Sequence, residues 1–242
     1  MCTVTFIPIK DKYVITSNRD EHISRPSASS PAEEIIDNCK IVFPKDPKAG
    51  GTWFAVNQKG MVGVLLNGAF EKHIRQENYL MSRGLVLLDL ISKDNLVNHF
   101  EYLPLEFIEP FTLIYFGHDN LVELRWDGVL KHKKYLDIKS SYIWSSVTLY
   151  SKEAISNREI LFDDFITTGR NTDENTIRKF HSNNNNDSEN GFLINRKNKM
   201  KTFSITQAVI SLKGIELTHF DLLNNKTYSK QIQQTNLNFL NK

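Results

Sequence analysis

The first 17 residues carry the pattern that most constrains the fold. β-branched and aromatic residues dominate from Thr3 to Ile9 and again from Tyr13 to Ser17, a composition typical of β-strands. The polar residues 10–12 between these runs predict a short turn, so residues 2–17 are expected to form a β-hairpin. The fold must therefore be built outward from a strand that begins at the second residue of the chain.

The rest of the chain alternates between short strands and pairs of helices. Apolar spacing predicts helices within residues 77–92, 96–103, 152–168 and 173–181. Strands are expected at residues 52–57, 61–67, 111–116, 121–126, 142–145, 203–212 and 215–222. Two helical pairs separated by antiparallel strands fit a four-layer arrangement, with helices outside two stacked sheets. The pattern alone also permits a simpler two-layer α+β domain. No repeat or linker is evident, so residues 1–242 are predicted to form a single domain.

Composition excludes several classes of function. Of the 242 residues, 40% are hydrophobic and 24% are charged, and the net charge of +2 gives no electrostatic case for binding nucleic acid or an anionic membrane surface. No apolar run is long enough to span a bilayer, and the start lacks the features of a secretory signal. Two cysteines, Cys2 and Cys39, make a weak case for a disulfide, so a cytoplasmic location with free thiols is the simplest expectation. The histidines show no metal-ligand spacing, and no metal site is predicted.

Cys2 is the residue best suited to covalent chemistry. Methionine aminopeptidase removes Met1 where the second residue is small, which would leave the thiol and a free α-amine on Cys2. An α-amine has a pKa of about 8 and a thiol one of about 8.5. The amine can therefore act as the base for its own thiol. The alternative is a cysteine that stands by chance at a frayed terminus, but the strand predicted from Thr3 onward favours a fixed position.

The segment Asn18-Arg19-Asp20-Glu21 ends the second strand of the predicted hairpin. A tight hairpin brings this end beside Cys2. Asp20 could accept a hydrogen bond from the α-ammonium and orient it. Arg19 could favour the thiolate by its charge or hold a substrate carboxylate. The alternative is a solvated cluster of ion pairs at the end of a strand.

Two further segments could complete a site. Asn67 ends a predicted strand, where its amide could donate to the oxyanion of a tetrahedral intermediate. On spacing alone, a simple turn at Asn67-Gly68 is the favoured interpretation. Gly50 and Gly51 lead into another strand, and they could let a ligand approach the backbone, with Trp53 as an apolar wall. These two glycines could equally do no more than form the turn before the strand.

Together these segments resemble a known family, the NRDE or transport and Golgi organisation protein 2 family. The resemblance rests on four blocks in compatible order and spacing: Met1-Cys2-Thr3, Asn18-Arg19-Asp20-Glu21, Gly50-Gly51-Thr52-Trp53 and Leu66-Asn67-Gly68. That family is similar to the choloylglycine hydrolases and penicillin acylases, which are N-terminal-nucleophile (Ntn) hydrolases. The resemblance implies an αββα sandwich of two antiparallel sheets flanked by helices. It also implies four catalytic roles, as nucleophile, electrostatic partner, orienting group and oxyanion donor, for Cys2, Arg19, Asp20 and Asn67.

The resemblance also implies where a ligand would bind. Four residues are expected to line the ligand pocket: Asn18, Gly51, Trp53 and Ser146. The chain departs from the family at two places. Ser146 stands where relatives usually have an asparagine of the site, and residues 202–204 lack an arginine that relatives carry near the C-terminal strand.

Two functions follow from this resemblance. The first is hydrolysis or acyl transfer at the linear C–N bond of a small-molecule amide, with Cys2 attacking the carbonyl and no cofactor required. The second is a non-catalytic protein that binds or carries haem, an acyl-CoA or a lipid in the same pocket, because the family is implicated in haem trafficking and in lipid metabolism. No Cys-Pro haem-binding dipeptide is present, so the sequence gives no independent support for haem.

Overall fold

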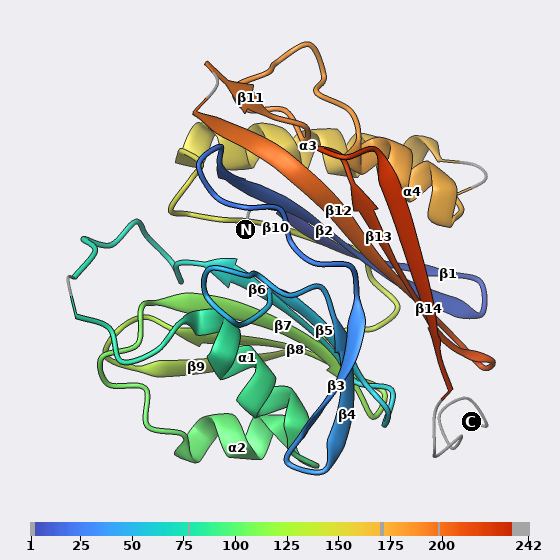
Figure 1. Ribbon diagram of the computed structural model, residues 1–242. Coiled ribbons are helices and arrows are strands. Elements are labelled where there is room, and N and C mark those ends of the chain that lie inside the picture. The colour runs from blue at the N-terminus through green and yellow to red at the C-terminus, as the bar shows by residue number, and fades with distance from the viewer. Residues whose placement is uncertain (1–2, 77, 170–171, 198, 234–242) are drawn as a thin grey trace.

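The computed structural model describes residues 3–76, 78–169, 172–197 and 199–233. Two antiparallel β-sheets stack face to face, and a pair of helices covers the outer face of each sheet (Figure 1). This is a four-layer αββα sandwich. The four-layer prediction is confirmed, and the two-layer alternative is wrong.

The first sheet contains the N-terminal hairpin. Its strands follow in the spatial order β10 (Tyr142–Ser145), β1 (Thr3–Ile9), β2 (Lys12–His22), β12 (Met200–Ser211), β13 (Gly214–Asp221) and β14 (Lys226–Ile232), and the short β11 (Asn195–Arg196) pairs with β12. Thr3 lies opposite Asn18 in β2 and opposite Ser145 in β10. The predicted hairpin is therefore confirmed, and β2 runs several residues beyond its predicted end.

The second sheet is a meander in which consecutive strands pair. It contains β3 (Ala32–Ile36), β4 (Cys39–Phe43), β5 (Phe54–Asn57), β6 (Val62–Asn67), β7 (Phe111–Gly117), β8 (Asn120–Trp126) and β9 (Lys131–Leu136). The sequence patterns do not predict β3, β4, β9 or β14. β3 and β9 are the two edges of this sheet and are rich in charged residues, which protect an exposed edge from pairing but hide the alternation of a strand.

Helices α1 (Arg83–Ser92) and α2 (Leu96–Tyr102) cover the second sheet, and α3 (Lys152–Thr168) and α4 (Glu174–His181) cover the first (Figure 1). Ser151 caps α3 by accepting from the backbone N–H of Ala154, as predicted. α1 begins later than the predicted start at residue 77, because Ser82 serves as its N-cap. Leu80, expected on the buried face of this helix, is 76% exposed. No helix within the described ranges is long and apolar enough to cross a membrane.

Alternation along β1 separates two environments. Val4 and Phe6 face the second sheet, where they join a core that includes Val62 and Val64. Ile7 faces the opposite way and packs with residues of α3 and α4. Residues of the same strand therefore reach either the space between the sheets or the helical layer. The candidate site residues at the end of β2 are divided in the same way.

Candidate active site

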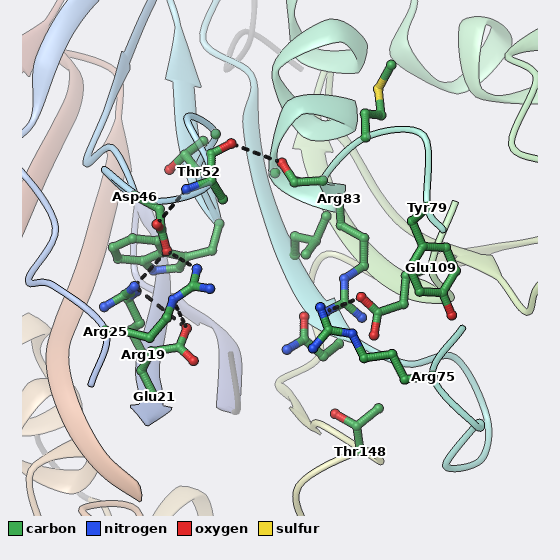
Figure 2. A pocket seen from close by; sticks show the side chains of 18 residues that line it. Arg19, Glu21, Arg25, Asp46, Thr52, Arg75, Tyr79, Arg83, Glu109 and Thr148 are labelled. Carbon is green, nitrogen blue, oxygen red and sulfur yellow. Dashed lines mark hydrogen bonds and ion pairs between the residues drawn. The ribbon is translucent and has the colours of Figure 1, made fainter. Parts of the chain in front are cut away.

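A cavity of about 550 Å³ opens where the end of β2 meets the loops of the second sheet (Figure 2). Its walls also come from the β4–β5 loop, the end of β6, the β6–α1 segment and the first residues of α1. The lining includes four of the residues that the sequence indicates: Arg19, Gly51, Trp53 and Asn67. The fold therefore gathers three separate sequence blocks around one hollow. Met1 and Cys2 lie outside the described residues.

Arg19 is a buried cation in the wall of this cavity. Its side chain is 1% exposed, and Nη2 donates to Oδ2 of Asp46 at 2.7 Å. The guanidinium carbon lies 4.9 Å from the centre of the Trp53 ring, a cation–π distance. Nη1 has no hydrogen-bond partner among the described residues. Because a buried N–H group without an acceptor is costly, Nη1 is available to a ligand.

Asp46 holds this arginine in place. Its carboxylate also accepts from Nη2 of Arg25 at 2.6 Å, and from the backbone N–H groups of Lys48 and Ala49. Burial acts to raise the pKa of Asp46, but the hydrogen bonds from Arg25, Ala49 and Arg19 outweigh it and lower the pKa below its ordinary value. The carboxylate is therefore ionised near neutral pH and fixes two guanidinium groups at one wall.

Asp20 belongs to the other face of β2. Its carboxylate accepts from the hydroxyl of Tyr150 at 2.7 Å and from Oγ1 of Thr202 at 2.5 Å, and the residue is 2% exposed. The ring of Tyr150 is stacked in turn by the guanidinium of Arg158, whose central carbon lies 3.5 Å from the ring centre. Asp20 therefore has a fixed orientation beside the first strand. It does not line the 550 Å³ cavity.

Asn18 also faces away from the cavity. Its Nδ2 donates to the backbone carbonyls of His181 at 3.0 Å and Phe192 at 2.9 Å, and its Oδ1 contacts Nδ1 of His181. Asn18 is completely buried. The structure thus places this side chain between β2 and α4 and not among the ligand-lining residues, where the family resemblance predicts it. Alternation along the strand is the reason, since only every second side chain of β2 reaches the cavity.

Two further buried residues support the start of β1 from the helical layer. Nε2 of His181 lies 2.8 Å from Oγ1 of Thr5. Burial and, to a smaller extent, the positive charge of Arg158 together lower the pKa of His181 to about 3. His181 is therefore neutral at physiological pH. Nη1 of Arg158 donates to Oγ1 of Thr3 at 2.5 Å and Nε donates to the carbonyl of Asn190 at 3.0 Å.

Asn67 lies at the end of β6 and lines the cavity. No described residue hydrogen-bonds to its side-chain amide, while its backbone carbonyl accepts from Oγ of Ser146 at 2.9 Å. Oγ of Ser146 also lies 3.0 Å from Oγ1 of Thr148. Thr148 lines the cavity, whereas Ser146 does not. Gly68 has a φ of 81°, so the predicted turn follows Asn67 directly. The turn and the cavity position of Asn67 coexist.

Gly51 and Trp53 shape the floor of the cavity. A Cβ atom on Gly51 would lie 2.4 Å from the carbonyl carbon of Gly84, so this glycine lets the first turn of α1 approach closely. Gly50 has a φ of 72° in the turn before β5, which is the simpler of the two roles considered for this glycine pair. Trp53 is 1% exposed and packs in the core between the sheets, beneath Arg19.

The opposite wall was not predicted from the sequence. It carries Arg75, Tyr79, Arg83 and Glu109, which lie together across the cavity from Arg19 (Figure 2). Nη2 of Arg83 lies 3.1 Å from Oε2 of Glu109. These residues come from the β6–α1 segment, the start of α1 and the residue before Pro110, and no local motif links them. Asp46, Tyr150, Arg158 and Thr202 were missed for the same reason, because only tertiary packing brings them to the site.

The described residues offer no ready metal site. No group of three or more His, Cys, Asp or Glu side chains within the described ranges could hold a metal ion. Cys39 is a free, buried thiol in the core beneath α1. Burial raises the pKa of the Cys39 thiol, which makes this cysteine a poor nucleophile.

Comparison with known sequences gives one family. The profile of the family described as Transport and Golgi organisation 2 matches residues 1–146. The comparison with curated proteins gives no match. The matched segment contains β1 to β10 and therefore includes both the hairpin and the strand that carries Asn67.

Solved structures resemble the whole fold at low sequence identity. The C2A mutant of conjugated bile acid hydrolase from Clostridium perfringens is 10% identical, with a TM-score of 0.56 and 100% of each chain covered. Penicillin V acylase from Agrobacterium tumefaciens is 11% identical, with a TM-score of 0.52, 96% of this chain and 86% of that chain covered. The Caenorhabditis elegans ortholog of N-acylethanolamine-hydrolyzing acid amidase is 11% identical, with a TM-score of 0.58 and coverage of 85% and 92%. The shared architecture is the Ntn-hydrolase sandwich.

Proposed function

Because the chain belongs to the Transport and Golgi organisation 2 family and has the Ntn-hydrolase fold, we propose that it is a cysteine hydrolase or acyltransferase acting on the linear C–N bond of a small-molecule amide. One observation carries the proposal. Arg19, a buried guanidinium with an unpartnered Nη1, lines a cavity at the end of β2. The pairing of Thr3 with Asn18 brings the start of β1 to this end.

The position proposed for Cys2 extends the alternation of β1 by one residue. Thr3 and Thr5 contact the helical layer through Arg158 and His181, whereas Val4 faces the second sheet. A residue directly before Thr3 would then face the same side as Val4 and Arg19. This alternation is the reason for proposing that the chemistry of position 2 takes place on the cavity side of the sheet.

The proposed reaction begins after removal of Met1. The α-amine of Cys2 takes the thiol proton, and the thiolate attacks the amide carbon to form a C–S bond. The oxyanion accepts hydrogen bonds from the Asn67 amide and a backbone N–H group. The C–N bond then breaks, the amine leaves with the proton held by the α-ammonium, and water or another acceptor cleaves the thioester. Arg19 would stabilise the negative charge of the thiolate, and Asp20 would orient the ammonium.

Haem or lipid carriage finds less support. The lining of the cavity carries seven charged side chains: Arg19, Glu21, Arg25, Asp46, Arg75, Arg83 and Glu109. Binding sites for large apolar ligands are lined mainly by hydrophobic and aromatic side chains, with few polar groups. Hydrolysis of a small polar amide is therefore the function that the site supports best.

Intact mass spectrometry tests the proposal directly. Protein isolated from cells should lack Met1, and a cysteine-reactive β-lactam should add once, at Cys2, and then be released as the thioester hydrolyses. An N-acyl p-nitroanilide should release p-nitroaniline over repeated turnovers. The Cys2→Ala variant should do neither, and the Cys39→Ala variant should do both, because Cys39 is buried away from the cavity. Processed protein whose Cys2 stays unmodified would refute the proposal.

A further inference from the structure

The wall of the cavity opposite Arg19 carries more positive charge than its own carboxylate balances. Arg83 is paired with Glu109, and Nη1 of Arg83 also donates to the carbonyl of Pro110 at 3.1 Å. Glu109 is shared with His73, whose Nε2 lies 3.2 Å from Oε1. Arg75 lines the same wall and has no ion pair with any described residue. This wall therefore has two guanidinium groups and a single carboxylate, which is paired with Arg83 and His73 and not with Arg75.

The charges on this wall act on one another. Burial lowers the pKa of Arg83; Glu109 acts against this effect, and the nearby positive charge of Arg75 adds to it. The carboxylate of Glu21, on the wall that carries Arg19, also acts on Arg83. Like charges held close together destabilise the empty cavity, and an anion bound between them would relieve the repulsion.

The start of α1 adds to the positive potential. Ser82, Arg83 and Gly84 line the cavity, so the N-terminal end of this ten-residue helix faces it. Helix N-termini favour negative charge because their first backbone N–H groups lack partners in the helix. A second and independent observation is the unpartnered Nη1 of Arg19, whose side chain is 99% buried in the facing wall. The wall of Arg19 thus offers a donor that no described group fills, and the wall of α1 adds positive potential.

We propose that the Arg75–Arg83 wall binds an anionic oxygen group, a carboxylate or a phosphate, on the substrate of this site. This inference rests on the proposed function, because it names the class of that enzyme's substrate. Arg75 would bind the anion directly, since its five donors form a fork that matches carboxylate and phosphate oxygens. Arg83 and the first turn of α1 would add positive electrostatic potential at the bound anion. The reacting amide would then lie toward Arg19 and Asn67.

Calorimetric binding to the full-length Cys2→Ala variant tests this inference without any turnover. The probes are hippurate, which carries a carboxylate; hippuramide, its neutral amide; and phenyl phosphate. Hippurate should bind about tenfold more tightly than hippuramide, as expected for a charge-assisted hydrogen bond. Arg75→Gln should remove most of that preference without unfolding the protein, because Arg75 is exposed. The matched control is Lys72→Gln, an exposed cation of the same segment outside the cavity, and it should keep the preference.

The probes distinguish the two kinds of anion. Tighter binding of phenyl phosphate than of hippurate, lost in Arg75→Gln, assigns the wall to phosphate, and the reverse order assigns it to carboxylate. Equal affinity for hippurate and hippuramide, a preference that survives Arg75→Gln, or no binding of any probe would overturn the inference. These outcomes do not depend on the thiol. An inert Cys2 in the acylation test would therefore refute the proposed hydrolase while leaving the anion site to be judged by binding.

Discussion

Neighbouring residues at the end of β2 face two different environments. On the helical side, Asn18 and Asp20 are completely engaged, the first with His181 and Phe192 and the second with Tyr150 and Thr202. On the cavity side, Arg19 is equally buried but leaves Nη1 without a partner. One short strand segment therefore presents a satisfied polar network on one face and an unsatisfied donor on the other.

The difference separates a supporting role from a binding role. Buried polar groups whose hydrogen bonds are all made within the protein add rigidity and specify one arrangement. A buried donor that is left open costs free energy in the empty protein, and this cost is recovered when a ligand supplies the acceptor. The helical face would accordingly hold the start of β1 in position, and the cavity face would act on substrate. Substitutions on the helical face should then lower stability more than activity, and substitutions on the cavity face should lower activity more than stability.

The largest effect is expected on the helical face, for Arg158→Met. This change removes the donors to Thr3 and Asn190 and the cation stacked on Tyr150, and leaves buried acceptors unsatisfied. We expect the free energy of unfolding to fall by about 3 kcal/mol. Urea-induced unfolding measures it. Lys152→Met, at a 90% exposed position of the same helix, serves as the control and should change it by no more than about 0.5 kcal/mol.

A loss below about 1 kcal/mol for Arg158→Met would contradict the supporting role of this face, since a single hydrogen bond contributes that much. The helical network would then be replaceable, and the start of β1 would depend mainly on its pairing with β2 and β10.

The next effect is expected on the cavity face, for Arg19→Met. Asp46 would still accept from Arg25 and from the N–H groups of Lys48 and Ala49, so the free energy of unfolding should fall by only about 1 kcal/mol. The rate of Cys2 acylation should instead fall about 100-fold, as when an electrostatic donor of an active site is removed. Stopped-flow or quenched-flow mass spectrometry measures this rate.

Arg19→Lys sharpens the same comparison. It restores a positive charge but not the forked donors that reach both Asp46 and the open side of the cavity. Partial recovery of the acylation rate is expected. A variant Arg19→Met that is strongly destabilised but reacts at the normal rate would assign Arg19 to the scaffold and reverse the roles of the two faces.

The sequence predicts local features of this site better than its assembly. The hairpin was predictable because strand alternation, the polar turn and the block at residues 18–21 lie within one short segment. That Asn18 faces α4 could not be foreseen, since it depends on which face of the sheet the helices cover. Asn67 was a candidate because it belongs to the Leu66-Asn67-Gly68 block of the resembled family, whereas its place before a glycine at the end of a strand favoured a simple turn.

The arginines of the far wall gave no signal of their own. Arg75 and Arg83 are ordinary basic residues in a segment between a strand and a helix, and only the approach of α1 to Gly51 brings them to the cavity. The charged edge strands β3 and β9 were missed for a related reason. Their stability comes from pairing with an apolar neighbour in the sheet, and their own side chains carry little of the pattern.

The last prediction is a pH dependence of stability that comes from two buried histidines, His181 on the helical face and His219 beside Trp53. Burial lowers the folded-state pKa of His181 from 6.5 to about 3, so folding requires the neutral imidazole. The unfolded chain binds a proton near pH 6.5, and it therefore holds more protons than the folded chain at lower pH. The stability that His181 contributes is complete above that pH and is lost as the pH falls toward about 3.

The loss for this histidine should reach about 1.4 kcal/mol per pH unit. His219 adds a similar slope down to its own lowered pKa of about 4, which burial also causes. Urea unfolding between pH 7.5 and about 4.5 should therefore show a steep fall for the wild type. His181→Gln should lose roughly half of that slope, because one of the two buried histidines remains. His22→Gln, at an exposed position, should leave the slope unchanged. If the slope of unfolding free energy against pH were unchanged in His181→Gln, His181 would already be protonated in the folded protein. The hydrogen-bond network around Asn18 would then be accessible to protons, and the helical face would be as accessible as the cavity.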